Sequence, residues 1–132
     1  MSSELILIVE DNPVNQKVAQ MMLKRIGFDS DVADNGKIAT ELLTERHYPL
    51  VLMDAQMPVM DGITATRWIR AELPAERQPR IVVMTASLYR DAKGEWDTVA
   101  IDGWAEKPIK LEQFEKLIRE VLSRTESKLL SS

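Results

Sequence analysis

Short apolar runs alternate with amphipathic stretches along this chain, and this alternation is the feature that most constrains its fold. Three of the runs are strongly apolar, at Leu5–Val9, Leu50–Met53 and Ile81–Met84. Between them, apolar residues recur at the spacing of one face of a helix. Repeated strand and helix units of this kind are typical of a mostly parallel sheet with helices on both faces. The sequence therefore predicts an α/β fold of five βα units.

The limits of the units follow from the pattern and from capping residues. Asn12 is the expected N-cap of the first helix, Asp61 is the expected cap of the third, and Gly94 interrupts the fourth. The predicted strands are Leu5–Val9, Asp29–Ala33, Leu50–Met53, Ile81–Met84 and Gly103–Ala105. The predicted helices run from Pro13 to just before Gly27, then over Gly36–Arg46, Ile63–Leu73 and Leu88–Val99, and end with one whose apolar stripe is Leu111, Phe114, Leu117, Ile118, Val121 and Leu122.

Composition limits the class of protein. The chain has 132 residues, which predicts a single domain over 1–124, with 125–132 as a tail or linker stub. Seventeen basic and 21 acidic residues give a net charge of −4 without long blocks, so we expect no direct binding of nucleic acid. Cysteine is absent, and every apolar run is far shorter than the ~18 residues of a membrane span. We expect a cytoplasmic protein without membrane insertion.

Three acids follow two of the predicted strands. Glu10 and Asp11 come directly after the first strand, and Asp54 comes directly after the third. The carboxyl ends of parallel strands meet at one edge of a sheet, where such folds bind their ligands. Three carboxylates held close together repel one another unless a cation neutralises them. Because hard oxygen ligands suit Mg2+, the sequence predicts a magnesium site there.

Two further strand ends carry polar groups. Thr85 follows the fourth strand, and Lys107 follows the fifth. With the acids they would supply one hydroxyl and one amine at the same edge of the sheet. Such a set could bind Mg2+ and hold a phosphoryl group, because the Lys107 amine would offset its charge and the Thr85 hydroxyl would donate to a phosphoryl oxygen.

Four motifs carry a family resemblance. They are Ile8-Val9-Glu10-Asp11-Asn12, Leu52-Met53-Asp54-Ala55-Gln56-Met57-Pro58-Val59-Met60-Asp61-Gly62, Met84-Thr85-Ala86 and Lys107-Pro108-Ile109. In this order and at this spacing they resemble the receiver domain of two-component response regulators and hybrid sensor histidine kinases, over residues 4–124. The resemblance implies a flavodoxin-like, doubly wound fold with strand order 2-1-3-4-5.

The resemblance also implies roles for the acids. Asp54 would be phosphorylated on its carboxylate, and Asp11 would bind Mg2+ directly. Glu10 would act on the metal through water, and Gln56 would offer its backbone carbonyl. Lys107, joined to the following proline by a peptide bond that is typically cis in this family, would pair with the phosphate.

A switch is implied as well. Thr85 would be the switch hydroxyl, and its movement would change the surface around the fourth helix, the fifth strand and the fifth helix. Three residues before Lys107 the family usually carries Tyr or Phe, whereas this chain has Trp104. The larger ring would either switch in the usual way or be held partly outward.

The first helix has a wide apolar stripe. Its projection places Val18, Ala19, Met22 and Ile26 on the inward face and leaves Val14 and Met21 on one flank. The flank is either plain hydrophobic excess or a docking patch. In the resembled family this helix is where histidine kinase or histidine phosphotransfer partners commonly bind.

The predicted function is that of a phosphoacceptor signalling domain, which takes a phosphoryl group from a phosphohistidine. We expect no enzymatic activity other than removal of its own phosphoryl group. We expect a monomer or weak dimer. The alternative is an aspartyl phosphohydrolase, which typically needs an acid two residues after its nucleophile, where this chain has Gln56. A flavin carrier is a third possibility, but Glu10 and Asp11 would repel its phosphate. A stand-alone regulator and the receiver of a hybrid kinase both remain open, although the run Asp11–Gln16 resembles hybrid kinases.

Overall fold

Five parallel strands form one sheet in the order β2-β1-β3-β4-β5. The structure is a computed structural model that describes residues 5–57, 60–92 and 94–131, so Pro58 and Val59 of the long motif lie outside it. The strand order confirms the predicted fold. The strands are β1 (Leu5–Val9), β2 (Asp29–Ala33), β3 (Leu50–Asp54), β4 (Arg80–Thr85) and β5 (Gly103–Glu106).

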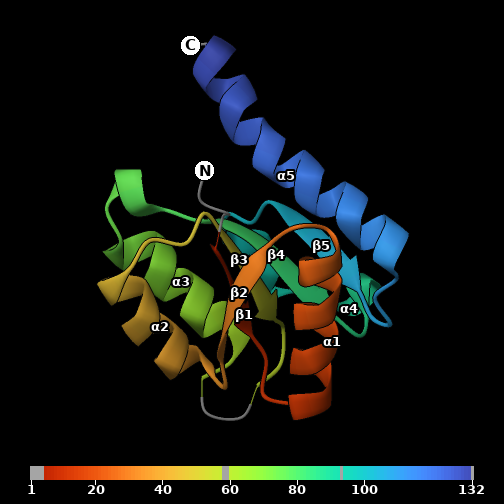
Figure 1. The fold of residues 1–132 in the computed structure, drawn as a ribbon. Coiled ribbons are helices and arrows are strands. Elements are labelled where there is room, and N and C mark those ends of the chain that lie inside the picture. Colours follow the sequence, from red (N-terminus) through yellow and green to blue (C-terminus); the bar gives the residue numbers. More distant parts are fainter. Residues whose placement is uncertain (1–4, 58–59, 93, 132) are drawn as a thin grey trace.

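Helices cover both faces of the sheet (Figure 1). A core under α2 and α3 contains Leu7 and Val9 of β1, and a second core under α1 and α5 contains Ile6 and Ile8 of the same strand. Alternate residues of a strand point to opposite faces, so a strand covered on both faces is apolar throughout. The helices are α1 (Pro13–Arg25), α2 (Gly36–Glu45), α3 (Gly62–Glu72), α4 (Leu88–Ala92) and α5 (Leu111–Ser131), with 3₁₀ turns η1 (Ala75–Arg77) and η2 (Glu95–Thr98).

The predicted caps are present. Asn12 Oδ1 accepts hydrogen bonds from the backbone N–H groups of Val14 and Asn15, at 2.8 and 3.1 Å. Asp61 Oδ1 accepts the N–H of Thr64 at 2.9 Å, which caps α3. Because an N-cap satisfies N–H groups that have no partner within the helix, these two residues fix where α1 and α3 leave the sheet edge.

The prediction of one helix over Leu88–Val99 is wrong. The α-helical part ends at Ala92, and a separate 3₁₀ turn follows Gly94. Gly94 has backbone angles of φ −98° and ψ −140°, outside the helical region, and the turn after it buries Trp96 in the core beneath α3. Burial of this large ring accompanies the departure of the chain from the helical path, and glycine is a poor helix former, which favours the end of the helix here.

The inward face of α1 also differs from its projection. Ala19 and Ile26 are buried as predicted, but Val18 is 42% exposed and Leu23 is fully buried instead. The helix is therefore rotated so that Ala19, Leu23 and Ile26 face the sheet.

The last helix has the predicted apolar stripe and extends farther along the chain than predicted. Phe114, Ile118 and Val121 are buried against the sheet. The helix continues to Ser131, so the backbone of the expected tail is helical through that residue.

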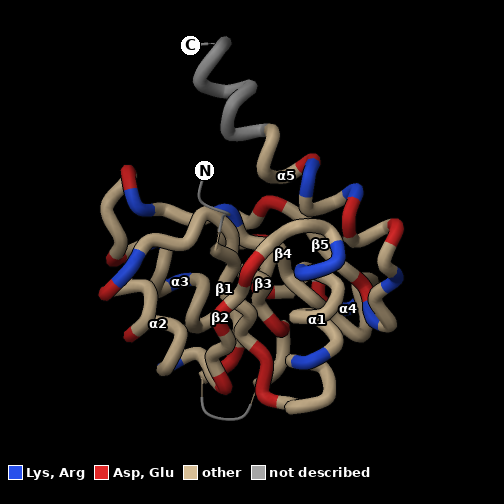
Figure 2. The backbone as a smooth tube through the Cα atoms, in the orientation of Figure 1, with Lys and Arg blue, Asp and Glu red and all other residues tan. Residues whose placement is uncertain are grey.

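Within the described ranges, no helix is both long and apolar enough to cross a membrane. Acidic and basic positions are interspersed along the described chain (Figure 2).

Candidate functional site

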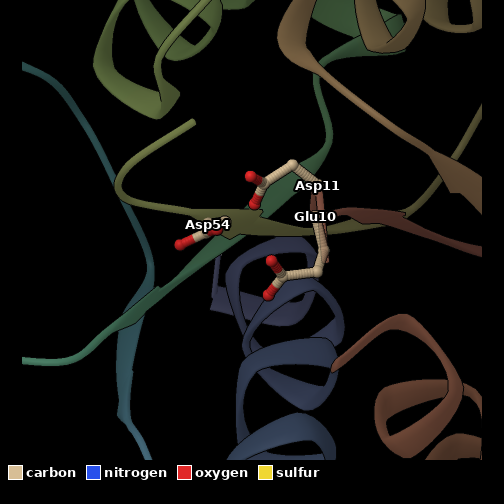
Figure 3. A group of neighbouring side chains, drawn as sticks. All are labelled: Glu10, Asp11 and Asp54. Atoms are coloured by element: carbon tan, nitrogen blue, oxygen red, sulfur yellow. The ribbon is translucent and has the colours of Figure 1, made fainter. Parts of the chain in front are cut away.

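Three acids meet at the carboxyl edge of the sheet. Each of Glu10, Asp11 and Asp54 offers a carboxylate oxygen, and these oxygens lie within 4.8 Å of one another. The carboxylates of Glu10 and Asp11 are directed toward the side where Asp54 lies (Figure 3). Glu10 and Asp54 are 2% and 5% exposed, whereas Asp11 is open to solvent. The strands β1 and β3, which are direct neighbours in the sheet, thus bring the predicted acids together.

Lys107 bridges the two buried acids. Its Nζ lies 3.1 Å from Glu10 Oε1 and 3.3 Å from Asp54 Oδ1. Burial by itself would lower the pKa of Lys107, but the charge of Asp54 and the hydrogen bond to Glu10 outweigh it and raise that pKa. The lysine is therefore a fixed positive charge at neutral pH. The Lys107–Pro108 peptide bond is cis, as the resemblance implied.

Several acceptor atoms of the acids remain open. Asp54 Oδ1 also accepts the backbone N–H of Gln56 at 3.3 Å, and Glu10 Oε2 accepts that of Asn12 at 3.2 Å. Among the described residues, Asp54 Oδ2 and the Asp11 carboxylate have no hydrogen-bond or ion-pair partner. Open carboxylate oxygens that line a cavity are the donors that Mg2+ prefers, so this set fits the cation.

Gln56 lies at the rim of the same cavity, with an exposed side chain. Its N–H is turned toward Asp54, while the role of its carbonyl as a metal ligand stays a prediction. The cavity is also lined by Arg90 and Asp91 from α4, which the sequence reasoning did not include. One signal could have found them: a helix that starts three residues after a strand end places its first turn over that edge of the sheet.

Thr85 is buried at the end of β4, with 1% of its surface exposed. Its hydroxyl donates a hydrogen bond to Asp91 Oδ2 and accepts one from the backbone N–H of Ser87 at 3.0 Å. The carbonyl of Thr85 accepts the N–H of Lys107 at 2.7 Å, which ties the two strand ends together. In this structure the Thr85 hydroxyl proton is thus directed at α4.

Trp104 lies on β5 beside Val83 of β4 and is partly buried. Its ring packs edge to face against Trp96, with the ring centroids 5.8 Å apart and the planes at 73°. Trp96 is buried and is a packing residue of the core. The link between Trp104 and Thr85 stays a prediction.

The flank of α1 is open to solvent. Val14 is 69% and Met21 is 66% exposed, as the projection predicted, and the exposed Val18 joins them. Exposed apolar side chains that lie together are typical of contact surfaces.

Comparison with known proteins agrees with this geometry. Residues 6–119 match the family described as "Response regulator receiver domain". Hybrid signal transduction histidine kinase F of Dictyostelium discoideum is 33% identical over 120 residues, which cover 89% of this chain and 11% of that protein. Aerobic respiration control sensor protein ArcB of Escherichia coli K12 is 34% identical over 114 residues, covering 86% of this chain and 14% of its own length.

A solved structure is similar over almost the whole chain. The receiver domain of sensor histidine kinase PA1611 from Pseudomonas aeruginosa PAO1 has a TM-score of 0.84 and 30% identity, covering 92% of this chain and 99% of that one. It is described with a magnesium ion coordinated in its active-site cleft. The chain spans 11% and 14% of the two curated relatives, so the similarity concerns one domain of longer proteins. By sequence and by fold, the chain belongs to the family of response regulator receiver domains.

Proposed function

We propose that this receiver domain accepts a phosphoryl group from a phosphohistidine partner on the carboxylate of Asp54. The observation that carries the proposal is the position of Asp54, buried at a strand end beside Lys107, with carboxylate oxygens of two further acids within 4.8 Å. The lysine offsets part of the negative charge of this nucleophile, and a cation bound by the three acids would offset more of it. The relatives that contain similar segments are histidine kinases, which supports a histidine donor.

The transfer forms one bond and breaks another. One carboxylate oxygen of Asp54 attacks phosphorus, the bond between phosphorus and the imidazole nitrogen breaks, and the imidazole keeps the electron pair. Asp11, Asp54 and the carbonyl of Gln56 would hold Mg2+, with Glu10 acting through water. The cation would neutralise charge on the phosphoryl oxygens. Lys107 would exchange part of its contact with Asp54 for a phosphoryl oxygen.

Loss of the phosphoryl group to water completes the cycle. Gln56 and Ser87, two residues beyond Asp54 and Thr85, flank the expected path of the attacking water. Neither side chain is a strong general base at neutral pH, so we expect slow to moderate self-hydrolysis, with a phosphorylated lifetime that is long compared with the turnover of a dedicated phosphatase. The same reasoning favours a switch over a phosphohydrolase. Measurement of the decay of the phosphorylated protein by intact mass would show an unexpectedly fast reaction directly.

The acceptor is tested with acetyl phosphate and Mg2+. The wild type should gain one phosphoryl group by intact mass spectrometry, and Asp54→Asn should gain none. Asp97→Asn, which removes an exposed acid on η2, is the control and should react like the wild type. Modification that persists in Asp54→Asn would contradict the assignment, and so would modification that survives removal of Mg2+ by a chelator.

The docking surface is a second part of the proposal. We propose that Val14 and Met21 contact a histidine phosphotransfer domain or a kinase dimerisation domain. Replacing both residues with glutamine should slow transfer from the protein partner but leave the reaction with acetyl phosphate almost unchanged, because only the first needs an interface. Tyr89→Gln removes an exposed ring from α4 and is the control for another face. Equal loss of both reactions would instead show that Val14 and Met21 stabilise the folded structure.

A further inference from the structure

The Thr85 hydroxyl has a single proton, and Asp91 holds it. A hydroxyl can donate one hydrogen bond, and here the acceptor is the Oδ2 atom of Asp91. The N–H of Ser87 occupies the other side of the same oxygen, at 3.0 Å. For Thr85 to donate to a phosphoryl group on Asp54, the hydrogen bond to Asp91 has to break first.

Asp91 is placed to keep that bond. Its side chain is 12% exposed, and its Oδ1 lies 3.5 Å from Arg90 Nε. Its backbone N–H donates to the carbonyl of Ser87 at 3.0 Å, and its own carbonyl accepts the N–H of Gly94 at 3.2 Å. The residue thus lies between the strand end and the break after α4. A hydrogen bond to a carboxylate is roughly twice as strong as one between neutral groups.

We propose that Asp91 is a positioning residue that holds Thr85 in the unphosphorylated orientation and competes with the phosphoryl group for its hydroxyl proton. The inference rests on the proposed function, because the competitor is a phosphoryl group on Asp54. Release of Thr85 also releases Asp91, whose backbone belongs to α4. Phosphorylation is thereby linked to this five-residue helix through one side-chain contact.

The test is the affinity for beryllofluoride, a stable mimic of the phosphoryl group, in the presence of Mg2+. Asp91→Ala should bind it about tenfold more tightly than the wild type, because the hydrogen bond between the Thr85 hydroxyl and the charged Asp91 no longer has to break on binding. Asp91→Asn keeps the shape and a weaker acceptor, so it should show an intermediate affinity. Asp97→Ala removes an exposed acid of the same charge and should bind like the wild type.

A double-mutant cycle separates the hydrogen bond from simple charge repulsion. In a Thr85→Ala background no proton remains to compete for, so Asp91→Ala should tighten binding much less than it does in the presence of Thr85. A second readout needs neither metal nor mimic: the Ser87 amide should exchange its hydrogen faster in metal-free Asp91→Ala, because the acceptor hydroxyl is no longer held.

Each result has a distinct meaning. Equal tightening in both backgrounds would overturn the inference, since Asp91 would then act through its charge alone. Unchanged affinity in a folded Asp91→Ala, with normal binding by the wild type, would overturn the inference and leave the proposed function intact. Failure of the wild type to bind beryllofluoride would overturn both.

Discussion

Replacing Lys107 with methionine should destabilise the protein strongly in the absence of metal, because two buried carboxylates would lose their shared counter-charge. Lys107 Nζ is 3.1 Å from Glu10 Oε1 and 3.3 Å from Asp54 Oδ1, and the two acid side chains are 2% and 8% exposed. Removing one partner of a buried ion pair costs about 3–5 kcal/mol. Lys107 itself is 26% exposed, so solvent screens part of this effect, and we expect a loss of about 2 kcal/mol.

Thermal unfolding followed by circular dichroism measures the loss. For a domain of this size, about 2 kcal/mol corresponds to a decrease in Tm of roughly 8 °C. Added Mg2+ should raise the Tm of Lys107→Met more than that of the wild type, because the cation replaces the missing charge. The matched control is Lys110→Met, which removes an exposed lysine close by and should have the same Tm as the wild type.

The effect also depends on pH in a defined direction. The folded-state pKa of Lys107 is raised, so the stability that it contributes is present below the ordinary lysine pKa and is lost as the pH rises through the folded value. The difference between wild type and Lys107→Met should therefore persist at pH 7–8 and shrink only above about pH 10.4. Equal Tm values for Lys107→Met and Lys110→Met in metal-free buffer at pH 7 would refute the reasoning.

Three further outcomes are expected. Gly62→Ala should lower stability by about 3 kcal/mol in urea unfolding, because the new Cβ would lie 2.2 Å from the carbonyl oxygen of Asp54, while Gly94→Ala meets nothing closer than 3.9 Å and should cost little. Tyr48→Phe should cost about 1 kcal/mol by the same measurement, because it removes the 2.6 Å hydrogen bond that the Tyr48 hydroxyl donates to Asp31. The fluorescence change on binding beryllofluoride should decrease in Trp104→Phe, and an unchanged signal would show that this ring does not report the switch.

Local patterns were enough to predict five βα units and a mostly parallel sheet, whereas the strand order was implied by the family resemblance. Apolar runs of strand length separated by helical spacing define five units, and this order of elements leaves few topologies for a parallel sheet. Capping is equally local, since Asn12 and Asp61 each bond to N–H groups two or three residues away. The motifs around Glu10, Asp54 and Lys107 then predicted which strand ends would meet. These predictions succeed because each depends on a residue and its near neighbours in the chain.

The errors and omissions concern the rotation and packing of helices. A projection of α1 cannot tell whether Val18 or Leu23 faces the sheet, because that depends on how the helix packs on β1 and β2. The break after Ala92 depends on the burial of Trp96 in a core that α2 and α3 complete. Both are decided by packing across the whole domain.

The sequence by itself determined the order of the elements and the set of groups at the carboxyl edge, because periodicity, capping and motif spacing are properties of short segments. Only the tertiary structure decided how those groups engage one another. Lys107 reaches acids 97 and 53 residues away, and the Thr85 proton points to Asp91 on α4. Such contacts arise where separate strands and helices are brought within hydrogen-bonding distance, and distances of that kind are set by the packed core rather than by any local pattern.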